Sequence, residues 1–444
     1  MLITNARIAT LGPEPRLIED GALYLDGDKI VAVDTTAALR ARYPEAECFD
    51  AGGQLALPAP LCGHTHFYGA FARGWAYPGP AATRFGEILE RLWWRLDKLL
   101  TPEDVRYSAL VCLADAIRHG TTTLIDHHAS PFAIPGSLDI IAEEVLRSGL
   151  RASLCYEVTD RDGEALAQAG LAENVRFLRR MQAQPHPQLA ASFGLHASLT
   201  LSEATLAAAV AAAEGLETGF HIHAAEGIED VEDSLRKSGR RVIHRLHAAG
   251  ILGPRSIVAH AVHVDESEME VLADTGTWVT HQPRSNMNNA VGAGQVERLL
   301  AHGVKVALGN DGFSNNMFAE MKAAYLVHKL AQQDPRAMPG DLVFRLAFDA
   351  NAQLARLFWP QATLGVLEPG ATADLILVDY HPITPLNAGN LPWHFLFGYE
   401  ASMITTTISA GRVLMRDRQV LTLDEEEITA RSRELAAKLW QRAL

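Results

Sequence analysis

The chain has 444 residues, of which 48% are hydrophobic and 21% are charged, a composition typical of a soluble globular protein too long for one small core. Its net charge of −14 disfavours a surface that neutralises phosphates, so no nucleic-acid partner is expected. The N-terminus does not resemble a signal peptide, and no apolar run approaches the ~18 residues of a membrane span. We therefore expect a cytoplasmic protein without a membrane partner.

The two ends of the chain predict a small β unit. Residues 2–8 and 21–33 have the alternation of short strands, with a hairpin turn at Gly27-Asp28. Strands return beyond about residue 355, and neither end has enough of them to bury a core alone. Residues 1–57 and 355–423 are therefore expected to form one composite β-sandwich domain. Residues 424–444 are expected to form a C-terminal helix, because Asp424 and Glu427 have the spacing of a capping box.

Residues 58–354 alternate short apolar segments with longer helical ones. This order predicts an α/β fold with a (β/α)₈ barrel of the TIM type. A doubly wound open sheet is the alternative, but it requires a glycine-rich first turn that none of these strands has. The eight strand candidates, the first of which begins just before this range, are 55–62, 122–126, 151–156, 189–196, 219–223, 256–260, 278–281 and 305–310.

Titratable side chains gather where these strands end. In a TIM-type barrel the reactive groups lie at the carboxyl ends of the strands, which all meet at one rim. Six of the eight candidates end at or run into such a residue, and the set is His64, His66, His196, His223, His260, His281 and Asp311. A structural role remains the alternative for any single histidine, and for His281 it is as good as the functional one.

Four of these residues form a plausible metal-ligand set. His64 and His66 lie two apart at a strand end, so both imidazoles face the same side of the strand. Adding the nitrogen of His223 and the carboxylate of Asp311 gives a set that suits Zn²⁺ and would also accept Fe²⁺ or Mn²⁺. A metal with an exchangeable position lowers the pKa of bound water towards ~7 and so supplies hydroxide at neutral pH.

Two further side chains have the chemistry of acid–base catalysis. Glu226 follows the fifth strand by three residues, where it can move a proton, and Asp311 can accept the proton of the attacking water. His260 can orient the hydroxide or stabilise the charge that develops on the substrate.

Six motifs together resemble the amidohydrolase superfamily, in its cytosine-deaminase-like branch with a single metal. They cover the predicted barrel and are Gly63-His64-Thr65-His66, Phe193-Gly194-Leu195-His196, His221-Ile222-His223-Ala224-Ala225-Glu226, Ala259-His260-Ala261-Val262-His263, His281-Gln282-Pro283-Arg284-Ser285-Asn286 and Leu308-Gly309-Asn310-Asp311-Gly312. The resemblance implies the metal ligands and proton carrier named above, and it makes His260 the partner of the hydroxide. It also implies that His196 contacts the substrate.

One absence and two departures qualify the resemblance. Binuclear members of the superfamily use a carboxylated lysine from the fourth strand, but no lysine occurs between Lys98 and Lys237, so a single metal is expected. Ala59 stands where the family usually has glycine, and Gln282 where asparagine is usual. The alanine at position 59 bears on the geometry of the turn, and the glutamine at position 282 bears on how the substrate fits.

Residues 226–234 and 282–289 are most similar to the SsnA-like aminohydrolases, which are grouped with chlorohydrolase-type and purine-metabolism enzymes. The resemblance implies a deaminase that releases ammonia from a C=N-bearing heterocycle such as a purine, pterin or triazine. Hydrolysis of a lactam or of a carbon–chlorine bond at the same site is the alternative. An inactive metal-binding scaffold is a third possibility, disfavoured because a scaffold needs neither Glu226 nor His260.

The remaining expectations are less specific. Arg73, Trp75 and Trp93-Trp94 lie in the long excursion after the first strand, which in such barrels can form a lid or a wall of the substrate pocket. His127 and His128 follow the second strand and can reach the pocket. The sequence leaves the oligomeric state open, a homodimer or a higher homo-oligomer included.

Overall fold

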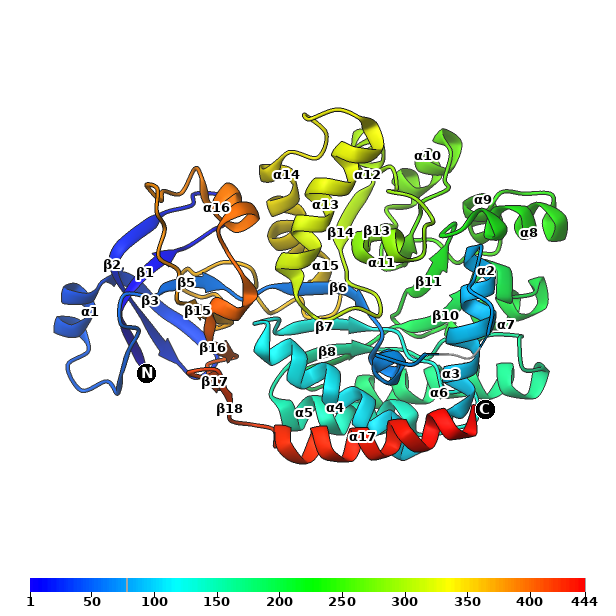
Figure 1. Cartoon of the computed structure of the whole chain (residues 1–444), viewed down its shortest axis with the longest axis horizontal. Coiled ribbons are helices and arrows are strands. Elements are labelled where there is room, and N and C mark those ends of the chain that lie inside the picture. Colours follow the sequence, from blue (N-terminus) through cyan, green and yellow to red (C-terminus); the bar gives the residue numbers. More distant parts are fainter. Residues whose placement is uncertain (77–78, 444) are drawn as a thin grey trace.

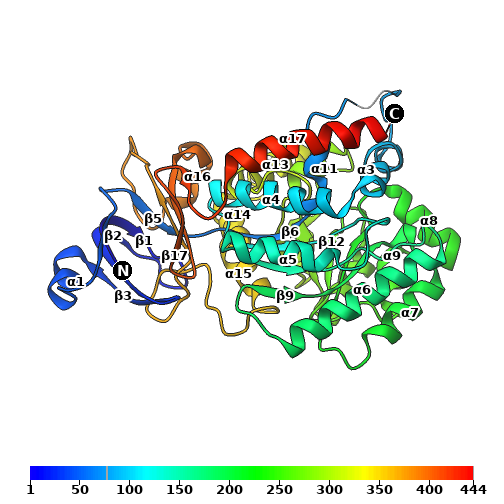
Figure 2. The same ribbon diagram turned by 90° about the horizontal axis from the view of Figure 1, so that it is seen from below.

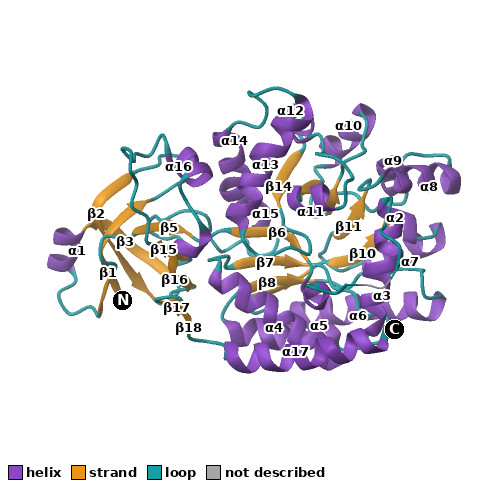
Figure 3. Ribbon diagram, in the orientation of Figure 1, coloured by secondary structure: helices purple, strands orange, loops and turns teal. Residues whose placement is uncertain are grey.

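The computed structural model describes residues 1–76 and 79–443. It has a β-sheet unit beside a larger body of alternating strands and helices, in which the helices surround the strands (Figures 1 and 3). Leu444, at the end of the predicted C-terminal helix, lies outside the described residues.

The β-sheet unit is a single nine-stranded sheet built from both ends of the chain. Its order is β18-β17-β16-β15-β5-β1-β2-β3, with β4 paired to β1. The strands are β1 Leu2–Ala9, β2 Leu17–Asp26, β3 Lys29–Thr35, β4 Cys48–Asp50, β5 Leu55–Pro58, β15 Leu375–Val378, β16 Ile404–Ser409, β17 Arg412–Arg416 and β18 Gln419–Val420. The N-terminal β5 pairs with the C-terminal β15, which confirms the predicted composite β unit.

The strands of the larger body run parallel and form a barrel. They lie in two sheets, β6 to β9 and β10 to β14, and β9 and β10 are separated only by Ser192, so they continue one another as a single barrel position. Their bounds are β6 Leu61–Thr65, β7 Thr123–Asp126, β8 Arg151–Leu154, β9 Leu189–Ala191, β10 Phe193–Ala197, β11 Phe220–Ala224, β12 Ile257–His260, β13 Trp278–His281 and β14 Lys305–Leu308. The predicted (β/α)₈ barrel is confirmed.

Helices cover the outside of the barrel and one small helix joins the composite sheet. They are α1 Thr36–Arg42, α2 Phe85–Ile88, α3 Trp94–Leu99, α4 Pro102–Arg118, α5 Ser137–Ser148, α6 Glu164–Ala183, α7 Glu203–Ala213, α8 Ile228–Ser238, α9 Val242–Ala248, α10 Glu266–Thr275, α11 Pro283–Asn288, α12 Val296–Ala301, α13 Met317–Gln332, α14 Gly340–Arg345, α15 Asn351–Ala355, α16 Leu391–Phe397 and α17 Glu425–Arg442. The last helix, α17, lies along α4 (Figure 2). It is anchored by Trp440, whose Nε1 donates to the carbonyl of Phe71 at 2.9 Å.

The structure divides the predicted first strand, 55–62, into two strands of different sheets. β5 belongs to the composite sheet, whereas β6 begins the barrel. Pro58 and Pro60 lie at this division, and because proline has no N–H it cannot continue a hydrogen-bonded ladder. We propose the domain division 1–57 with 355–423, 58–354 and 424–444, with this proline pair marking the first boundary.

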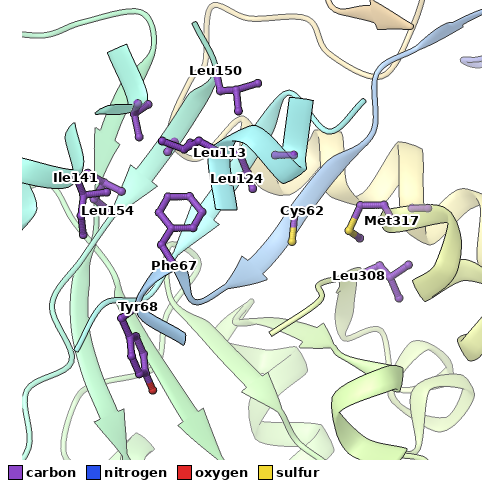
Figure 4. Close-up of a cluster of buried hydrophobic side chains, with 14 of the residues drawn as sticks. Cys62, Phe67, Tyr68, Leu113, Leu124, Ile141, Leu150, Leu154, Leu308 and Met317 are labelled. Atoms are coloured by element: carbon purple, nitrogen blue, oxygen red, sulfur yellow. The ribbon is translucent and has the colours of Figure 1, made fainter. Parts of the chain in front are cut away.

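The layer between barrel strands and helices is apolar and begins directly behind the first strand. Phe67, just after β6, points towards Leu113 of α4 and Leu124 of β7, while its neighbour Tyr68 points the other way (Figure 4). Both aromatic side chains are buried. Among residues 1–76 and 79–443, no helix combines the length and the apolar character needed to cross a bilayer.

Candidate metal centre

The carboxyl ends of β6, β11 and β14 bring the four predicted ligand side chains together. His66 Nε2 lies 3.1 Å from His223 Nε2 and 2.8 Å from Asp311 Oδ1. His64 Nε2 lies 3.3 Å from the same oxygen of Asp311. The three imidazoles are buried.

In His66 and His223, the second ring nitrogen fixes which atom is free to bind a cation. His66 Nδ1 donates to the carbonyl of His127 at 2.6 Å, and His223 Nδ1 donates to the carbonyl of His196 at 2.7 Å. Because a carbonyl only accepts hydrogen bonds, each Nδ1 carries a proton and each neutral ring presents the lone pair of Nε2. When both rings are neutral, these two lone pairs and the carboxylate oxygen repel one another at these distances, and a cation between them removes the repulsion. The residues therefore fit a divalent metal of the zinc type.

Backbone contacts hold the end of β14 against the end of β6. The amide of Asp311 donates to the carbonyl of His64, and the amide of His66 donates to the carbonyl of Asp311, both at 3.1 Å. Gly309 permits this approach, because a Cβ there would lie 2.9 Å from the backbone of His64. Asp311 has a φ of 58°, in the left-handed region where strain in non-glycine residues is typical of functional sites. Its second oxygen accepts from Ser285 Oγ at 2.5 Å.

Glu226 and His260 lie beside the ligand set. Glu226 Oε1 accepts from Asn289 Nδ2 at 3.1 Å, and its Oε2 is 3.5 Å from His260 Nε2. His260 Nδ1 in turn contacts Asn286 Oδ1 at 2.8 Å. Burial raises the pKa of Glu226 to about 7, so this carboxyl group can both give and take a proton near neutral pH.

A pocket of about 630 Å³, including space open to solvent, lies over these residues. Phe85, Leu89 and Trp93 form an apolar wall, and they come from the excursion after β6 that was expected to provide a lid or wall. His196 lines the pocket, with its Nδ1 2.7 Å from Thr200 Oγ1. The pocket therefore joins a polar floor at the ligand set to an apolar side wall.

Among the other histidines named from the sequence, His127 converges with the ligand set, since its ligand atom lies within 4.8 Å of those of His64, His66 and His223. His128 and His281 have different surroundings. The ring of His127 lies 5.6 Å from that of His66, whereas His128 contacts Ser130 Oγ through its Nε2 at 2.9 Å. His281 faces away from the ligand set, because its Nε2 lies 3.1 Å from His328 Nε2.

The aromatic and basic residues of the excursion also separate. Trp94 lies behind the pocket, with its ring 6.3 Å from that of His196, while Trp75 packs partly buried against the core. Arg73 lines a neighbouring cavity, and Trp93, Asn289, Asp311 and Gly312 line both cavities.

Sequence reasoning missed two buried carboxylates. Asp230 lines the pocket and accepts from the amide of Ala225 at 2.6 Å, which fixes the turn after β11. Glu157 follows β8 and lies among three imidazoles. Glu157 lies just beyond a barrel strand, and this is the same sequence position from which the histidines were predicted.

Comparison with known proteins identifies the family. The chain matches the model of the Amidohydrolase family over residues 55–414, and residues 21–46 match the model "Imidazolonepropionase-like composite domain, bacteria". Among solved structures, an adenosine deaminase from Xanthomonas campestris with bound zinc superimposes with a TM-score of 0.85 at 24% identity, covering 99% of this chain and 98% of the other. The atrazine chlorohydrolase TrzN from Arthrobacter aurescens TC1, also with zinc, gives 0.82 at 22% identity, covering 98% and 99%.

Curated relatives are more similar in sequence. A 5-methylthioadenosine/S-adenosylhomocysteine deaminase from Desulforudis audaxviator is 33% identical over 94% of this chain and 95% of its own length. A 5'-deoxyadenosine deaminase from Methanosarcina mazei is 31% identical over 99% of this chain and 98% of its own. Both coverages span the composite sheet as well as the barrel. The chain belongs to the amidohydrolase family.

Proposed function

We propose that this chain is a zinc-dependent deaminase of adenosine-type nucleosides whose 5' position carries a small apolar group. Both curated relatives described above are deaminases of adenosine-type compounds, and the predicted reaction class, hydrolytic release of ammonia from a C=N-bearing ring, is confirmed. The substrate and the roles of individual residues are our proposal. The observation that carries it is the pocket itself, which places Glu226 and the ligand set against an apolar wall.

We assign the metal to His64, His66, His223 and Asp311, whose possible ligand atoms converge at the strand ends. When bound, such a cation lowers the pKa of a water molecule and so supplies the hydroxide nucleophile. The four side chains fix the position of that cation at the pocket floor, and Ser285 fixes the carboxylate of Asp311.

Glu226 is assigned as the proton carrier. With a pKa of about 7 it can pass one proton of the water to the ring nitrogen beside the carbon under attack. The second proton, from the hydroxyl group then on that carbon, would be accepted by Asp311 and passed to the amino group, which leaves as ammonia. Asn289 holds one carboxylate oxygen of Glu226, so the other is left for this exchange. His260, held by Asn286, is assigned to orient the attacking water, and His196 to contact the heterocycle from the pocket wall.

The lining of the pocket supports a substrate without a negative charge. Its charged members, Glu226, Asp230 and Asp311, are all acidic, and no lysine or arginine is present among the described residues that line it. Without lysine or arginine, this lining offers no side-chain cation to pair with a 5'-phosphate or with the carboxylate of an amino acid substituent. The wall of Phe85, Leu89 and Trp93 suits a methylthio or methyl group.

The test is ammonia release by the zinc-loaded protein from 5'-methylthioadenosine, 5'-deoxyadenosine, S-adenosylhomocysteine and adenosine 5'-monophosphate. We expect the first two to have the higher kcat/KM values. Chloride release or ring opening, measured in parallel on triazines and lactams, would contradict the proposal if either exceeded nucleoside deamination. Deamination of none of these heterocycles by zinc-loaded protein would favour the scaffold alternative.

The proposal includes a cytoplasmic location and a homodimer or higher homo-oligomer as the assembly. Cell fractionation and sedimentation of the purified protein test these two points.

A further inference from the structure

Glu157 is a buried carboxylate at the rim of the barrel that the proposed chemistry does not use. It follows β8, where its amide donates to the carbonyl of His128 at 2.8 Å, and its side chain is 1% exposed. No lysine or arginine among the described residues comes within ion-pair distance of it. A carboxylate removed from water needs other partners, because burying it alone is energetically costly.

Three imidazoles surround this carboxylate. Glu157 Oε1 lies 3.2 Å from His66 Nδ1 and 3.2 Å from His127 Nδ1. Its Oε2 lies 3.6 Å from His196 Nε2. One of these rings is a proposed metal ligand and another lines the substrate pocket. Glu157 therefore touches both functional parts of the site from behind.

The ring nitrogens that face Glu157 make the carboxylate the common charged neighbour of the three imidazoles. His127 Nε2 donates to the carbonyl of His221 at 3.0 Å, so its Nδ1, which lies 3.2 Å from Glu157 Oε1, carries a proton towards the carboxylate only when the ring is an imidazolium. Neither His127 Nδ1 nor Glu157 Oε1 has a partner with hydrogen-bond geometry among the described residues, so their 3.2 Å contact is an electrostatic one. His66 Nδ1 directs its proton into the corner between the carbonyl of His127 and the carboxylate.

We propose that Glu157 is the positioning residue of the metal centre, orienting His66 towards the metal and His196 towards the substrate. A carboxylate behind a metal-binding histidine fixes the ring and makes its free nitrogen a stronger donor to the metal. At His196 the 3.6 Å separation is too long for a direct hydrogen bond, so the effect there is electrostatic attraction on the Nε2 edge of the ring. This inference rests on the proposed function for the identity of the metal ligands.

The contacts of Glu157 also allow a different role, as a ligand of a second metal ion, and that role would overturn the proposal. Ligand atoms of Glu157, His196 and His223 lie within 4.8 Å of one another, as a metal site would require. A metal there would draw His223 from the proposed set. If Glu157 were a ligand of a second ion, its loss would change metal stoichiometry and not only affinity.

The experiment compares Glu157→Gln with Glu173→Gln. Glu173 is also buried but lies on α6, where it accepts from the amides of Gly136 and Leu138 away from the site. Zinc affinity is measured by competition with a chelator, together with kcat, KM and the melting temperature. We expect Glu157→Gln to weaken zinc binding about 10–100-fold and to raise KM, because outer partners of metal ligands typically have effects of that size. Glu173→Gln should change only the melting temperature.

Unchanged zinc affinity and KM in Glu157→Gln would overturn the proposal, as would two zinc ions in the parent protein with one lost in the variant. Should Glu157→Gln fail to fold, Glu157→Asp decides the matter, since it keeps the charge but withdraws it from the rings. It should then weaken zinc binding, and parent-like affinity in Glu157→Asp would overturn the proposal. The zinc measurement needs no substrate, so it tests this inference even if the protein deaminates none of the nucleosides.

Discussion

The two ends of the barrel strands both bury charged side chains, but they satisfy them differently. At the amino ends, beside the composite sheet, Asp374 accepts from Arg151 Nη1 at 2.7 Å, from Thr122 Oγ1 at 2.9 Å and from the amide of Ala410 at 2.7 Å. Every acceptor there has a donor, and the ion pair is 4% and 3% exposed. This cluster joins the two units and has no need of a ligand.

At the carboxyl ends the acceptors face one another. In the neutral form of both rings, the Nε2 atoms of His66 and His223 and the oxygen of Asp311 converge with no proton between them. Such an arrangement is unstable by itself and becomes stable when a cation occupies it. The difference teaches that burial alone does not mark a functional site. A functional site is marked instead by buried hydrogen-bond acceptors that lack donors.

The largest expected effect comes from removing one of these acceptors. His223→Asn shortens the side chain and takes away the nitrogen that faces His66. We expect loss of bound zinc and of nearly all deaminase activity, while the circular dichroism spectrum remains native. Zinc content by elemental analysis checks this, and near-stoichiometric zinc in the variant would contradict the ligand assignment.

The next effect separates proton transfer from metal binding. Glu226→Gln keeps the size of the side chain but cannot carry a proton, so kcat should fall ~10²–10⁴-fold with zinc retained. The measurement is kcat on zinc-saturated protein alongside metal content. If activity instead follows zinc occupancy, Glu226 is a metal ligand.

The amino-end cluster predicts the opposite pattern. Arg151→Met removes the cation and leaves Asp374 buried without its charge partner, which should lower the free energy of unfolding by about 3–5 kcal/mol. Zinc affinity, and kcat at a temperature where the variant is folded, should stay at parent values. Denaturant unfolding provides the measurement, and a changed zinc affinity would mean that the two ends are not independent.

The strand-end histidines could be predicted because they follow from one rule applied to short apolar runs. His64, His223 and Asp311 lie at strand ends, and parallel strands bring such ends to one rim. The composite sheet was predictable for a similar reason, since neither terminal group of strands is sufficient alone. The split between β5 and β6 was missed because the apolar run continues through Pro58 and Pro60, although these prolines interrupt the ladder.

Contacts without a local pattern could not be predicted. Arg151 and Asp374 are separated by 223 residues, and no sequence pattern in either segment predicts that the two side chains form an ion pair. Glu157 stands beyond a strand, but a single carboxylate there is as typical of a solvated turn as of a buried group. Asn289, just after α11, holds Glu226 only because that helix turns its C-terminal end over the pocket.

The most direct test of the central claim is the zinc content of two proteins, the parent and His260→Asn. His260 belongs to the same convergent group as the ligands but lies 3.5 Å from Glu226, where we assign it to the attacking water. We predict one zinc per chain in both, with kcat/KM lowered only in His260→Asn. Two zinc ions in the parent, or loss of zinc in His260→Asn equal to that in His223→Asn, would contradict the account.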